Sequence, residues 1–313
     1  MERKILSLDG GGLKGLFSVT LISEIEEELS CHIYEYFDMI AGTSTGGIIA
    51  AGLAMGIPAK EIKELYVQHA KEIFPNDRFK IWKHFGLFKP KYTNEELKKQ
   101  LEAVFGDATV GMCKTRLLIP SYNLSTGKIT VFKTSHAEDL MIDYKRKIVD
   151  VIMSTTAAPT YLPPYKTSSG TYIDGGIGAN NPSIIALVEA ISRCKWDMEH
   201  IRMLSVGCTE AIDSSTTGRE KLTIIPDALK VLKLFMRAET QYSENISNIL
   251  LGNNRFLRIN PIDLNNAFSL DRSDSKTLDE LVVIGKEKAK EKMDLIRKMF
   301  IDEKVETFVP FHR

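Results

Sequence analysis

Ser44 lies in the stretch of this sequence that is best suited to chemistry. It is the centre of Gly42-Thr43-Ser44-Thr45-Gly46, a G-x-S-x-G pattern between a short apolar run and a run rich in glycine, alanine and isoleucine. The order predicts a strand, a tight turn and a helix, which lifts a serine hydroxyl above the sheet edge at the positive end of the helix. A serine held there can attack an ester carbonyl. The pentapeptide alone also fits an ordinary Gly/Ser turn.

A glycine-rich loop near the start of the chain offers donors for the oxyanion that such an attack creates. Residues 9–15 read DGGGLKG, between the apolar run at residues 4–8 and a stretch with helical periodicity. Successive glycine N–H groups at a helix entrance bind negative charge. We expect the N–H groups of Gly11 and Gly12 to hold the oxyanion. The predicted oxyanion loop comprises Gly10, Gly11, Gly12, Lys14 and Gly15.

The same loop also satisfies G-x-G-x-x-G, the pattern of dinucleotide-binding folds. Those folds expect an acidic residue at the end of the second strand, about 20 residues further on. Here the second strand runs into the Ser44 turn instead, and Asp38 lies before that strand. A non-enzymatic module that binds a nucleotide through the glycine loop is therefore the alternative class of function.

Asp174 is the acid best framed to accept the serine proton. The sequence TYIDGG predicts a short strand that delivers Asp174 to a flexible turn at Gly175 and Gly176. An ordinary aspartate, with a pKa of roughly 3.9, is a weak base, so the site must raise the pKa or hold the pair in favourable geometry. Histidine would be a stronger base. His200 and His312 both follow Asp174, which leaves open a Ser-Asp-His triad of α/β-hydrolase type.

The three turns can meet only if one sheet positions them. In an open α/β sheet, loops after different strands converge at the carboxyl ends. Hydrophobic periodicity and turn signals predict the elements. The predicted strands span residues 4–8, 39–41, 116–123, 128–133, 171–173, 201–206 and 256–259. The predicted helices span residues 16–29, 59–74, 93–105 with a Thr93/Glu96 capping box, 144–155, a segment opened by Asn181 and Pro182, 227–251 and 277–303.

Composition excludes several classes of protein. Lys+Arg and Asp+Glu both number 41 in 313 residues, so no overall charge indicates a nucleic-acid partner. Residues 39–59 carry no charge, but their glycines, hydroxyl groups and proline fit a buried core better than a membrane span. The start of the chain has no secretory pattern, and the spaced cysteines suggest neither a disulfide framework nor zinc. We therefore expect a cytoplasmic protein.

An unusual segment begins at Arg78 and ends at Tyr92. It interleaves aromatic rings with lysines and arginine and contains no acid. Rings at headgroup depth and cations facing phosphates are typical of transient contact with a membrane surface. The alternative is a loop whose aromatic side chains fill the core and whose cations are solvated.

Four motifs, in order, resemble those of the patatin-like phospholipase family. They are DGGGLKG at residues 9–15, GTSTGG at 42–47, APTYLPP at 158–164 and DGG at 174–176. The resemblance implies a three-layer α/β/α fold with a mostly parallel central sheet, and a Ser44–Asp174 dyad without histidine. It also implies phospholipase A or lysophospholipase activity on membrane phospholipids, with no metal or cofactor. Lys14 departs from the arginine usual in the family, and lysine lacks the planar fork.

The resemblance covers about residues 4–207 and implies a single domain over residues 1–313. Residues 215–313 form a mainly helical extension without a motif of their own. Some bacterial relatives resemble anti-phage effectors switched on by a signalling nucleotide, so an activating nucleotide is a candidate partner. Lys230, Lys233 and Arg237 on one predicted helix could face it. We expect a peripheral enzyme at the membrane when active, and the sequence leaves the oligomeric state open.

Overall fold

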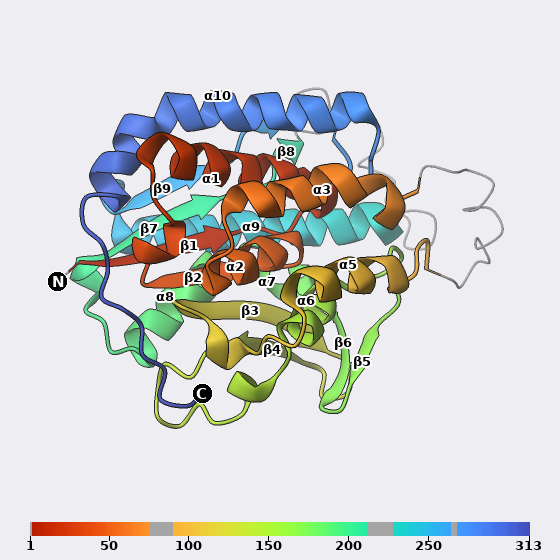
Figure 1. Ribbon diagram of the computed structural model, residues 1–313, viewed down its shortest axis with the longest axis horizontal. Coiled ribbons are helices and arrows are strands. Elements are labelled where there is room, and N and C mark those ends of the chain that lie inside the picture. Colours follow the sequence, from red (N-terminus) through yellow and green to blue (C-terminus); the bar gives the residue numbers. More distant parts are fainter. Residues whose placement is uncertain (1, 76–89, 212–227, 264–267) are drawn as a thin grey trace.

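The computed structural model describes residues 2–75, 90–211, 228–263 and 268–313. In this part of the chain an eight-stranded sheet has seven of its strands in the order β5-β6-β3-β2-β1-β7-β9 (Figure 1). The eighth strand, β4, lies outside that order and pairs with β3. The strands are β1 (Arg3–Leu8), β2 (Met39–Gly42), β3 (Arg116–Asn123), β4 (Lys128–Lys133), β5 (Tyr165–Thr167), β6 (Gly170–Asp174), β7 (Ile201–Val206) and β9 (Phe256–Ile259). A second, two-stranded sheet pairs β8 (Glu210–Ala211) with β10 (Ile262–Asp263).

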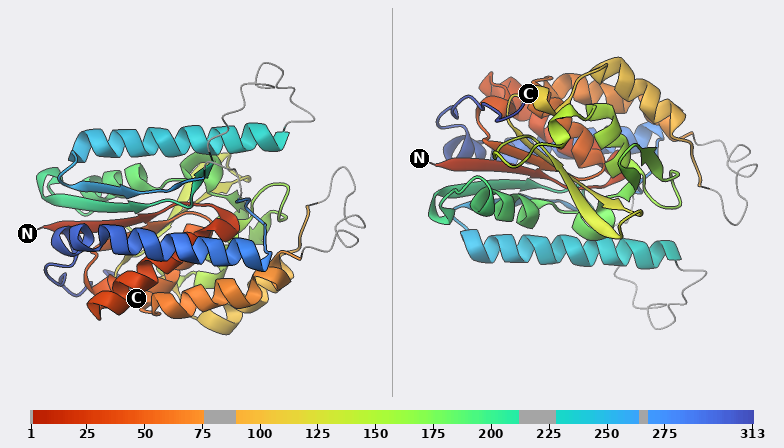
Figure 2. Two further views of the ribbon diagram at one scale, coloured as in Figure 1. Left: turned by 90° about the horizontal axis from the view of Figure 1, so that it is seen from above. Right: turned by 90° about the horizontal axis from the view of Figure 1, so that it is seen from below.

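Helices cover both faces of the sheet. One face carries α1 (Gly15–Leu29), α2 (Thr45–Met55), α3 (Ala59–Ile73) and α10 (Ser275–Phe300), and the other carries α8 (Ser183–Ser192) and α9 (Ala228–Leu251) (Figure 2). The remaining helices of the described residues are α5 (Glu95–Phe105), α6 (Ile148–Thr156) and α7 (Gly176–Ala179). Short 3-10 turns span Gly12–Lys14, Ile33–Glu35, Val110–Met112, Asp143–Lys145 and Met198–His200.

The central strands are apolar on both sides because helices bury both of their faces. Along β1, Leu6 and Leu8 pack in the core under α1 and α2, whereas Ile5 packs in a separate core with Leu187 of α8. Neighbouring residues of a strand point to opposite faces. The predicted three-layer α/β/α fold is therefore confirmed.

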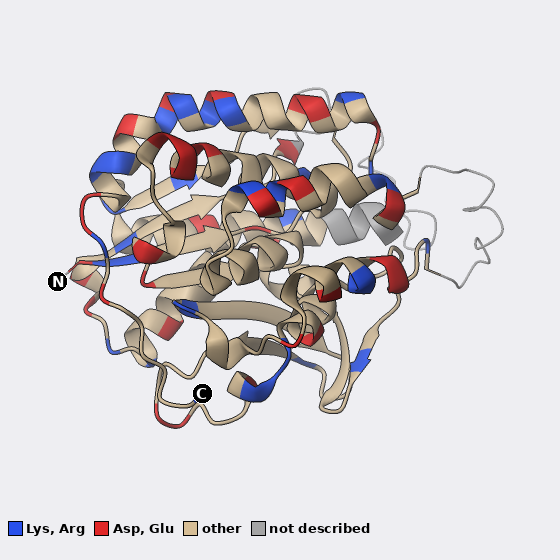
Figure 3. Cartoon of the chain, viewed as in Figure 1, with Lys and Arg blue, Asp and Glu red and all other residues tan. Residues whose placement is uncertain are grey.

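The outer helices are amphipathic. Lys/Arg and Asp/Glu are interspersed along the outer surface of α10, whereas Leu278, Leu281, Ala289 and Ile296 are buried on its inner side (Figure 3). The uncharged residues 39–59 form β2, α2 and their connections in the core, as expected. None of the described helices combines the length and the apolar character needed to cross a bilayer.

Several predicted boundaries are wrong by a few residues. The Thr93/Glu96 capping box is absent, because α5 begins at Glu95 with Asn94 at its N-cap. Asn181 was expected at the N-cap of α8 and Pro182 at its first position, but Pro182 occupies the N-cap. The helix expected at residues 144–155 is a 3-10 turn followed by α6, and α10 ends at Phe300 rather than 303.

Strand β6 departs from the parallel arrangement in a way that matters for the site. β1, β2, β3, β7 and β9 are parallel neighbours, whereas β6 runs antiparallel to β3. β6 pairs only with the far half of β3, where Ser121 faces Asp174, while β2 pairs with the near half, up to Leu118. The last residue of β6 therefore comes back to a level just beyond the end of β2.

Candidate active site

Ser44 occupies a strained turn between β2 and α2. Its backbone has φ 55° and ψ −120°, values that a non-glycine residue rarely adopts. The turn is also tightly packed, since a Cβ on Gly42 would lie 2.1 Å from the Gly46 carbonyl oxygen, and one on Gly46 would lie 2.3 Å from that of Leu8. These two glycines are therefore required by close backbone approach. Thr43 fixes the same turn from the other side, because its hydroxyl donates to the carbonyl of Ala179 at 2.6 Å.

Thr155 of α6 holds the turn in place. The backbone N–H of Ser44 donates to Thr155 Oγ1 at 2.9 Å, and Thr155 Oγ1 donates to the carbonyl of Pro120 in β3 at 2.6 Å. The strained backbone is thus supported by two neighbouring elements.

Asp174 meets Ser44 directly. The hydroxyl of Ser44 donates to Asp174 Oδ2 at 2.5 Å, and the backbone N–H of Gly176 donates to Asp174 Oδ1 at 2.7 Å. A Cβ on Gly175 would lie 2.2 Å from the Pro120 carbonyl oxygen, so this turn too requires glycine. Both side chains are buried, with Ser44 8% and Asp174 3% exposed.

Burial also makes Asp174 a stronger base. Removal from water raises the pKa of its carboxyl from 3.8 to about 6, although the hydrogen bonds from Ser44 and Gly176 act in the opposite direction. A carboxylate with that pKa, already hydrogen-bonded to a hydroxyl, can remove its proton near neutral pH.

The glycine loop lies against the serine turn, with the Cβ position of Gly10 only 3.3 Å from Ser44 Cβ. Within the described residues, the N–H groups of Gly11 and Gly12 have no hydrogen-bond partner, so both can donate to an oxyanion. Gly12 has φ +58°, and a Cβ there would lie 2.1 Å from the Leu270 carbonyl oxygen.

The other members of the predicted oxyanion loop have different roles. The N–H of Gly10 donates to the Asn180 carbonyl at 3.0 Å, and that of Gly15 donates within the 3-10 turn. The Lys14 ammonium donates to the Thr209 carbonyl at 2.9 Å. A Cβ on Gly15 would lie 2.7 Å from the side chain of Thr45, so these two residues pack the loop onto α2.

An apolar pocket opens above the Ser44–Asp174 pair. Its walls come from α3, α5 and the segment after α6, which carries the proline-rich motif. Ile177 and Met236 close the side toward α7 and α9. The apolar lining comprises Leu13, Ile48, Leu65, Ala70, Ile73, Phe74, Leu97, Leu101, Ala158, Pro159, Leu162, Ile177, Met236 and Leu270. Such a lining suits a hydrocarbon chain.

The histidines proposed for a triad lie elsewhere. His200 precedes β7 beside Glu2, at the amino ends of the parallel strands, and His312 Nε2 lies 2.8 Å from the Glu138 carbonyl oxygen. Among the described histidines none contacts Ser44 or Asp174, and His84 lies outside the described residues. The triad alternative with His200 or His312 is therefore wrong. The described residues also hold no cluster of potential metal ligands.

Comparison with known proteins agrees with this geometry. The family model described as patatin-like phospholipase matches residues 6–187, more than half of the chain. The chain belongs to the patatin-like phospholipase family. Solved structures similar to this chain include that of VipD from Legionella pneumophila. The TM-score is 0.53 and the sequence identity 16%, and the match covers 94% of this chain and 67% of that one. At that identity the likeness concerns the patatin fold alone.

Relatives of this patatin-like chain include bacterial and plant proteins. A protein named "cGAMP-activated phospholipase" from Vibrio cholerae is 36% identical, covering 72% of this chain and 67% of the relative. Its namesake from Escherichia coli is 38% identical, covering 65% and 61%. "Patatin-like protein 4" of Arabidopsis thaliana is 34% identical, covering 60% and 52%. The chain thus spans about two thirds or less of the length of these relatives.

The structure describes part of the two regions of this patatin-like chain that were predicted to contact a membrane and a nucleotide. Residues 78–89 lie outside the described residues, but Tyr92 is buried and donates to Asp271 at 2.9 Å, and Lys91 forms an ion pair with the same carboxylate. The end of the predicted membrane segment is therefore part of the core. Arg237 forms an ion pair with Glu210 at 2.8 Å. The side chains of Lys230 and Lys233 lie outside the described part.

Sequence reasoning missed several residues of this patatin-like site. Thr155 sits in an ordinary helical pattern and gives no signal of its role. Asn180 follows Asp174 closely and binds both the glycine loop and Thr240 of α9. Met236 reaches the pocket from the extension that matched no motif, and only its place on the apolar side of a helix could have indicated burial.

Proposed function

We propose that this chain is a serine acyl hydrolase that cleaves acyl esters of membrane phospholipids. The observation that carries the proposal is the 2.5 Å hydrogen bond from Ser44 Oγ to a buried carboxylate at the base of an apolar pocket. The membership in the patatin-like phospholipase family supports the same class of reaction. Ser44 is the nucleophile and Asp174 the general base.

In the first half of the reaction, Asp174 takes the hydroxyl proton as Ser44 Oγ bonds to the ester carbonyl carbon. The carbonyl oxygen becomes an oxyanion and accepts hydrogen bonds from the N–H groups of Gly11 and Gly12. When the tetrahedral intermediate collapses, the bond to the leaving alcohol breaks. Protonated Asp174 returns its proton to that alcohol, which leaves as a lysophospholipid or a glycerophospho-alcohol.

In the second half, water replaces the alcohol. Asp174 removes a proton from water as the oxygen attacks the acyl-serine, and the same N–H groups stabilise the second oxyanion. Collapse breaks the Ser44–acyl bond, the serine regains a proton from Asp174, and a fatty acid leaves. The reaction consumes one water and needs no redox partner.

The pocket supports a lipid substrate. The walls formed by α3, α5 and the proline-rich segment are almost entirely apolar, so a hydrocarbon chain gains by leaving water there. An enzyme reaches the hydrocarbon chains of membrane lipids from the bilayer surface, and we propose that this enzyme works there as a peripheral protein.

Phospholipid vesicles test the proposal. Wild-type protein, with cGAMP present in one arm, should release fatty acid detectable by mass spectrometry, and a fluorophosphonate probe should label it. Ser44→Ala should do neither. If wild type releases no more fatty acid than Ser44→Ala across several headgroups in both arms, the proposal is wrong.

Activation by a nucleotide is a second proposal, favoured by the names of the bacterial relatives. Those proteins are called cGAMP-activated, and they match this chain over most of its length. We propose that a cyclic dinucleotide likewise raises the activity of this chain. A vesicle assay that gives the same rate with and without cGAMP would contradict activation while leaving the hydrolase proposal intact.

A further inference from the structure

Arg258 lies on β9, beyond the region that the family model matches, yet it binds the residue that opens the glycine loop. Its Nη1 donates to Asp9 Oδ1 at 2.9 Å and its Nη2 donates to Asp9 Oδ2 at 2.5 Å. Both side chains are almost fully buried, with 9% and 4% of their surface exposed. A bidentate arginine–carboxylate pair fixes direction as well as distance, because both groups are planar forks.

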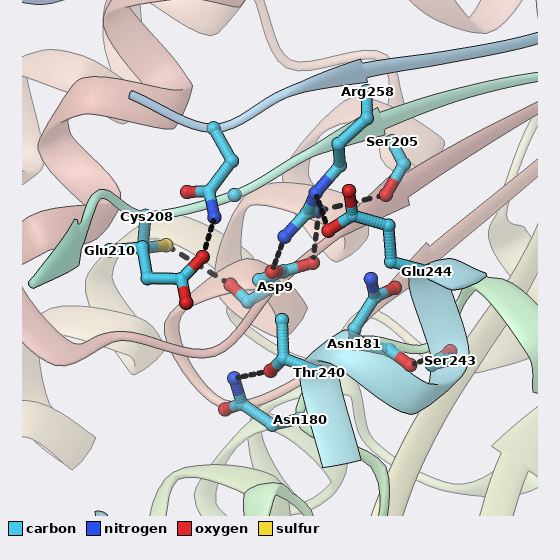
Figure 4. A network of polar contacts seen from close by, with 12 residues as sticks. Asp9, Asn180, Asn181, Ser205, Cys208, Glu210, Thr240, Ser243, Glu244 and Arg258 are labelled. Carbon is cyan, nitrogen blue, oxygen red and sulfur yellow. Dashed lines mark hydrogen bonds and ion pairs between the residues drawn. The ribbon is translucent and has the colours of Figure 1, made fainter. Parts of the chain in front are cut away.

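Arg258 is itself held from two other elements. Nη1 also donates to Ser205 Oγ of β7 at 2.8 Å, and Nε lies 3.2 Å from Glu244 Oε2 of α9 (Figure 4). The guanidinium therefore connects β9 to β7, to α9 and to the residue that follows β1. An arginine fixed at three places can position what it binds.

Asp9 is the residue of the loop that neighbouring elements hold through both its backbone and its side chain. Its N–H donates to the Val206 carbonyl at 3.0 Å, and its own carbonyl accepts from the Cys208 thiol at 3.2 Å. The next three residues are glycines without side chains. The N–H of Gly10 donates to the Asn180 carbonyl at 3.0 Å, and the next backbone N–H with a partner outside the loop is that of Leu13, which donates to the Leu270 carbonyl at 2.8 Å.

The Asp9 carboxylate therefore lies just upstream of the two N–H groups available for an oxyanion. Rotation of the Asp9 backbone would turn the peptide planes that follow it. Because Gly11 and Gly12 have no side chains to resist such rotation, the direction of their N–H groups depends on the anchors on either side, at Asp9 and Gly10 before them and at Leu13 after them.

We propose that Arg258 is a positioning residue for the oxyanion loop, acting through Asp9. This inference rests on the proposed hydrolase function. Loss of the Arg258–Asp9 ion pair should leave the nucleophile, the base and the acyl pocket in place while the N–H donors of Gly11 and Gly12 are misdirected. The defect should therefore affect the rate of bond formation and not substrate affinity.

The test compares Arg258→Gln and Arg258→Lys with Arg255→Gln. Arg255 stands just before the same strand, and its Nη1 donates to the Met198 carbonyl at 2.5 Å, at the amino ends of the parallel strands and away from the glycine loop. Removing one oxyanion donor typically costs about 10²–10³ in kcat. We expect Arg258→Gln to lower kcat about 10²-fold with KM nearly unchanged. Arg258→Lys, which keeps the charge but not the fork, should lose about tenfold.

Fluorophosphonate labelling separates positioning from folding. Counting labelled sites gives the fraction of folded enzyme, and the labelling rate per site reports stabilisation of the phosphonyl oxygen. Arg258→Gln should slow that rate as much as hydrolysis, whereas Arg255→Gln should match wild type. The pH at which activity is half-maximal should stay near the pKa of about 6 of Asp174 in both variants.

Each outcome decides whether Arg258 positions the oxyanion loop or only stabilises the fold. If Arg258→Gln has fewer labelled sites but a normal rate per site, Arg258 only stabilises the fold and the inference is wrong. If wild type is not labelled at all, the proposed function itself fails. Should Arg258→Gln not fold, Asp9→Asn must show the same kcat defect. The double variant Asp9→Asn/Arg258→Lys must then be no worse than the poorer single variant, because the two residues act as a unit.

Discussion

Replacing Asp174 by asparagine should abolish activity while making the protein more stable at alkaline pH. The structure fixes how the new amide would lie. The N–H of Gly176 points at Oδ1, so the amide oxygen must stay there and the amide nitrogen must take the place of Oδ2. The nitrogen then donates toward the Ser44 hydroxyl instead of accepting its proton. We expect kcat to fall about 10⁴-fold, the size of the loss when the aspartate of a Ser-His-Asp triad is replaced by asparagine.

The stability effect follows from the pKa of Asp174. Burial raises it from 3.8 to about 6, so the folded protein binds this proton more tightly than the unfolded chain does. The stabilising effect of that proton is present below pH 4 and is lost as the pH rises through 6. Above pH 6 the ionised carboxylate costs the folded state about 3 kcal/mol, at about 1.36 kcal/mol for each pH unit. The neutral amide does not incur that cost.

Thermal unfolding at several pH values measures the difference. At pH 8 Asp174→Asn should melt higher than wild type, by roughly 5 °C for a chain of 313 residues, and the gap should close below pH 4. Ser44→Ala is the matched control, since it is also inactive but keeps the buried carboxylate, and it should show no such gain. The reasoning fails if Asp174→Asn is less stable than wild type at pH 8, or if it keeps a hundredth or more of the activity.

Three further results are expected. In wild type, kcat/KM should rise with pH through about 6 as Asp174 loses its proton, and a profile flat between pH 5 and 8 would contradict its role as the base. Gly11→Ala should lower kcat about 10²-fold with little change in KM, because its Cβ would lie 2.4 Å from Cys208 Cβ and must displace a donor; an unchanged kcat would exclude that N–H from the oxyanion hole. Leu101→Trp should fill the pocket and shift preference toward short acyl esters in a chain-length series, whereas unchanged selectivity would mean that the acyl chain lies elsewhere.

The central strands and the serine turn could be predicted because their signals are local. The apolar run of β1 and the periodicity of α1 follow from residues close in sequence, and Gly42 is needed for a contact inside the turn itself. Gly46 belongs to the same local G-x-S-x-G pattern, although the contact that requires it is with Leu8 of β1. The donors at Gly11 and Gly12 follow from the same kind of information. The bond made by the N–H group of Gly10 could not be predicted, since its acceptor lies at Asn180, far along the chain.

The position of Asp174 beside Ser44 was predicted, but the reasoning behind that prediction was incomplete. Convergence of loops at the carboxyl ends of parallel strands accounts for Ser44 and the glycine loop. It does not account for Asp174, which reaches the site on an antiparallel strand paired with the far half of β3. The sequence TYIDGG has no feature that specifies its partner strand, because strand pairing is set by non-local packing.

Arg258 illustrates a signal that was visible but not used. An arginine within the short core strand FLRI must find a buried partner, because an isolated buried charge is very costly. The partner could not be named from sequence, since several acids were available. In the structure the partner is Asp9, so a residue of the extension without a motif acts on the first of the recognised motifs.

The charges around the site explain how a carboxylate can serve as base without histidine. A cation beside Asp174 would lower its pKa and weaken it. Among the described residues the positive charges near the glycine loop, Arg258 and Lys14, act on Asp9 instead, where they oppose the effect of burial. The pKa of Asp174 reflects only burial and the hydrogen bonds from Ser44 and Gly176. Asp9 thus allows an arginine to support the oxyanion loop while the base stays buried, uncompensated and basic enough to take the serine proton.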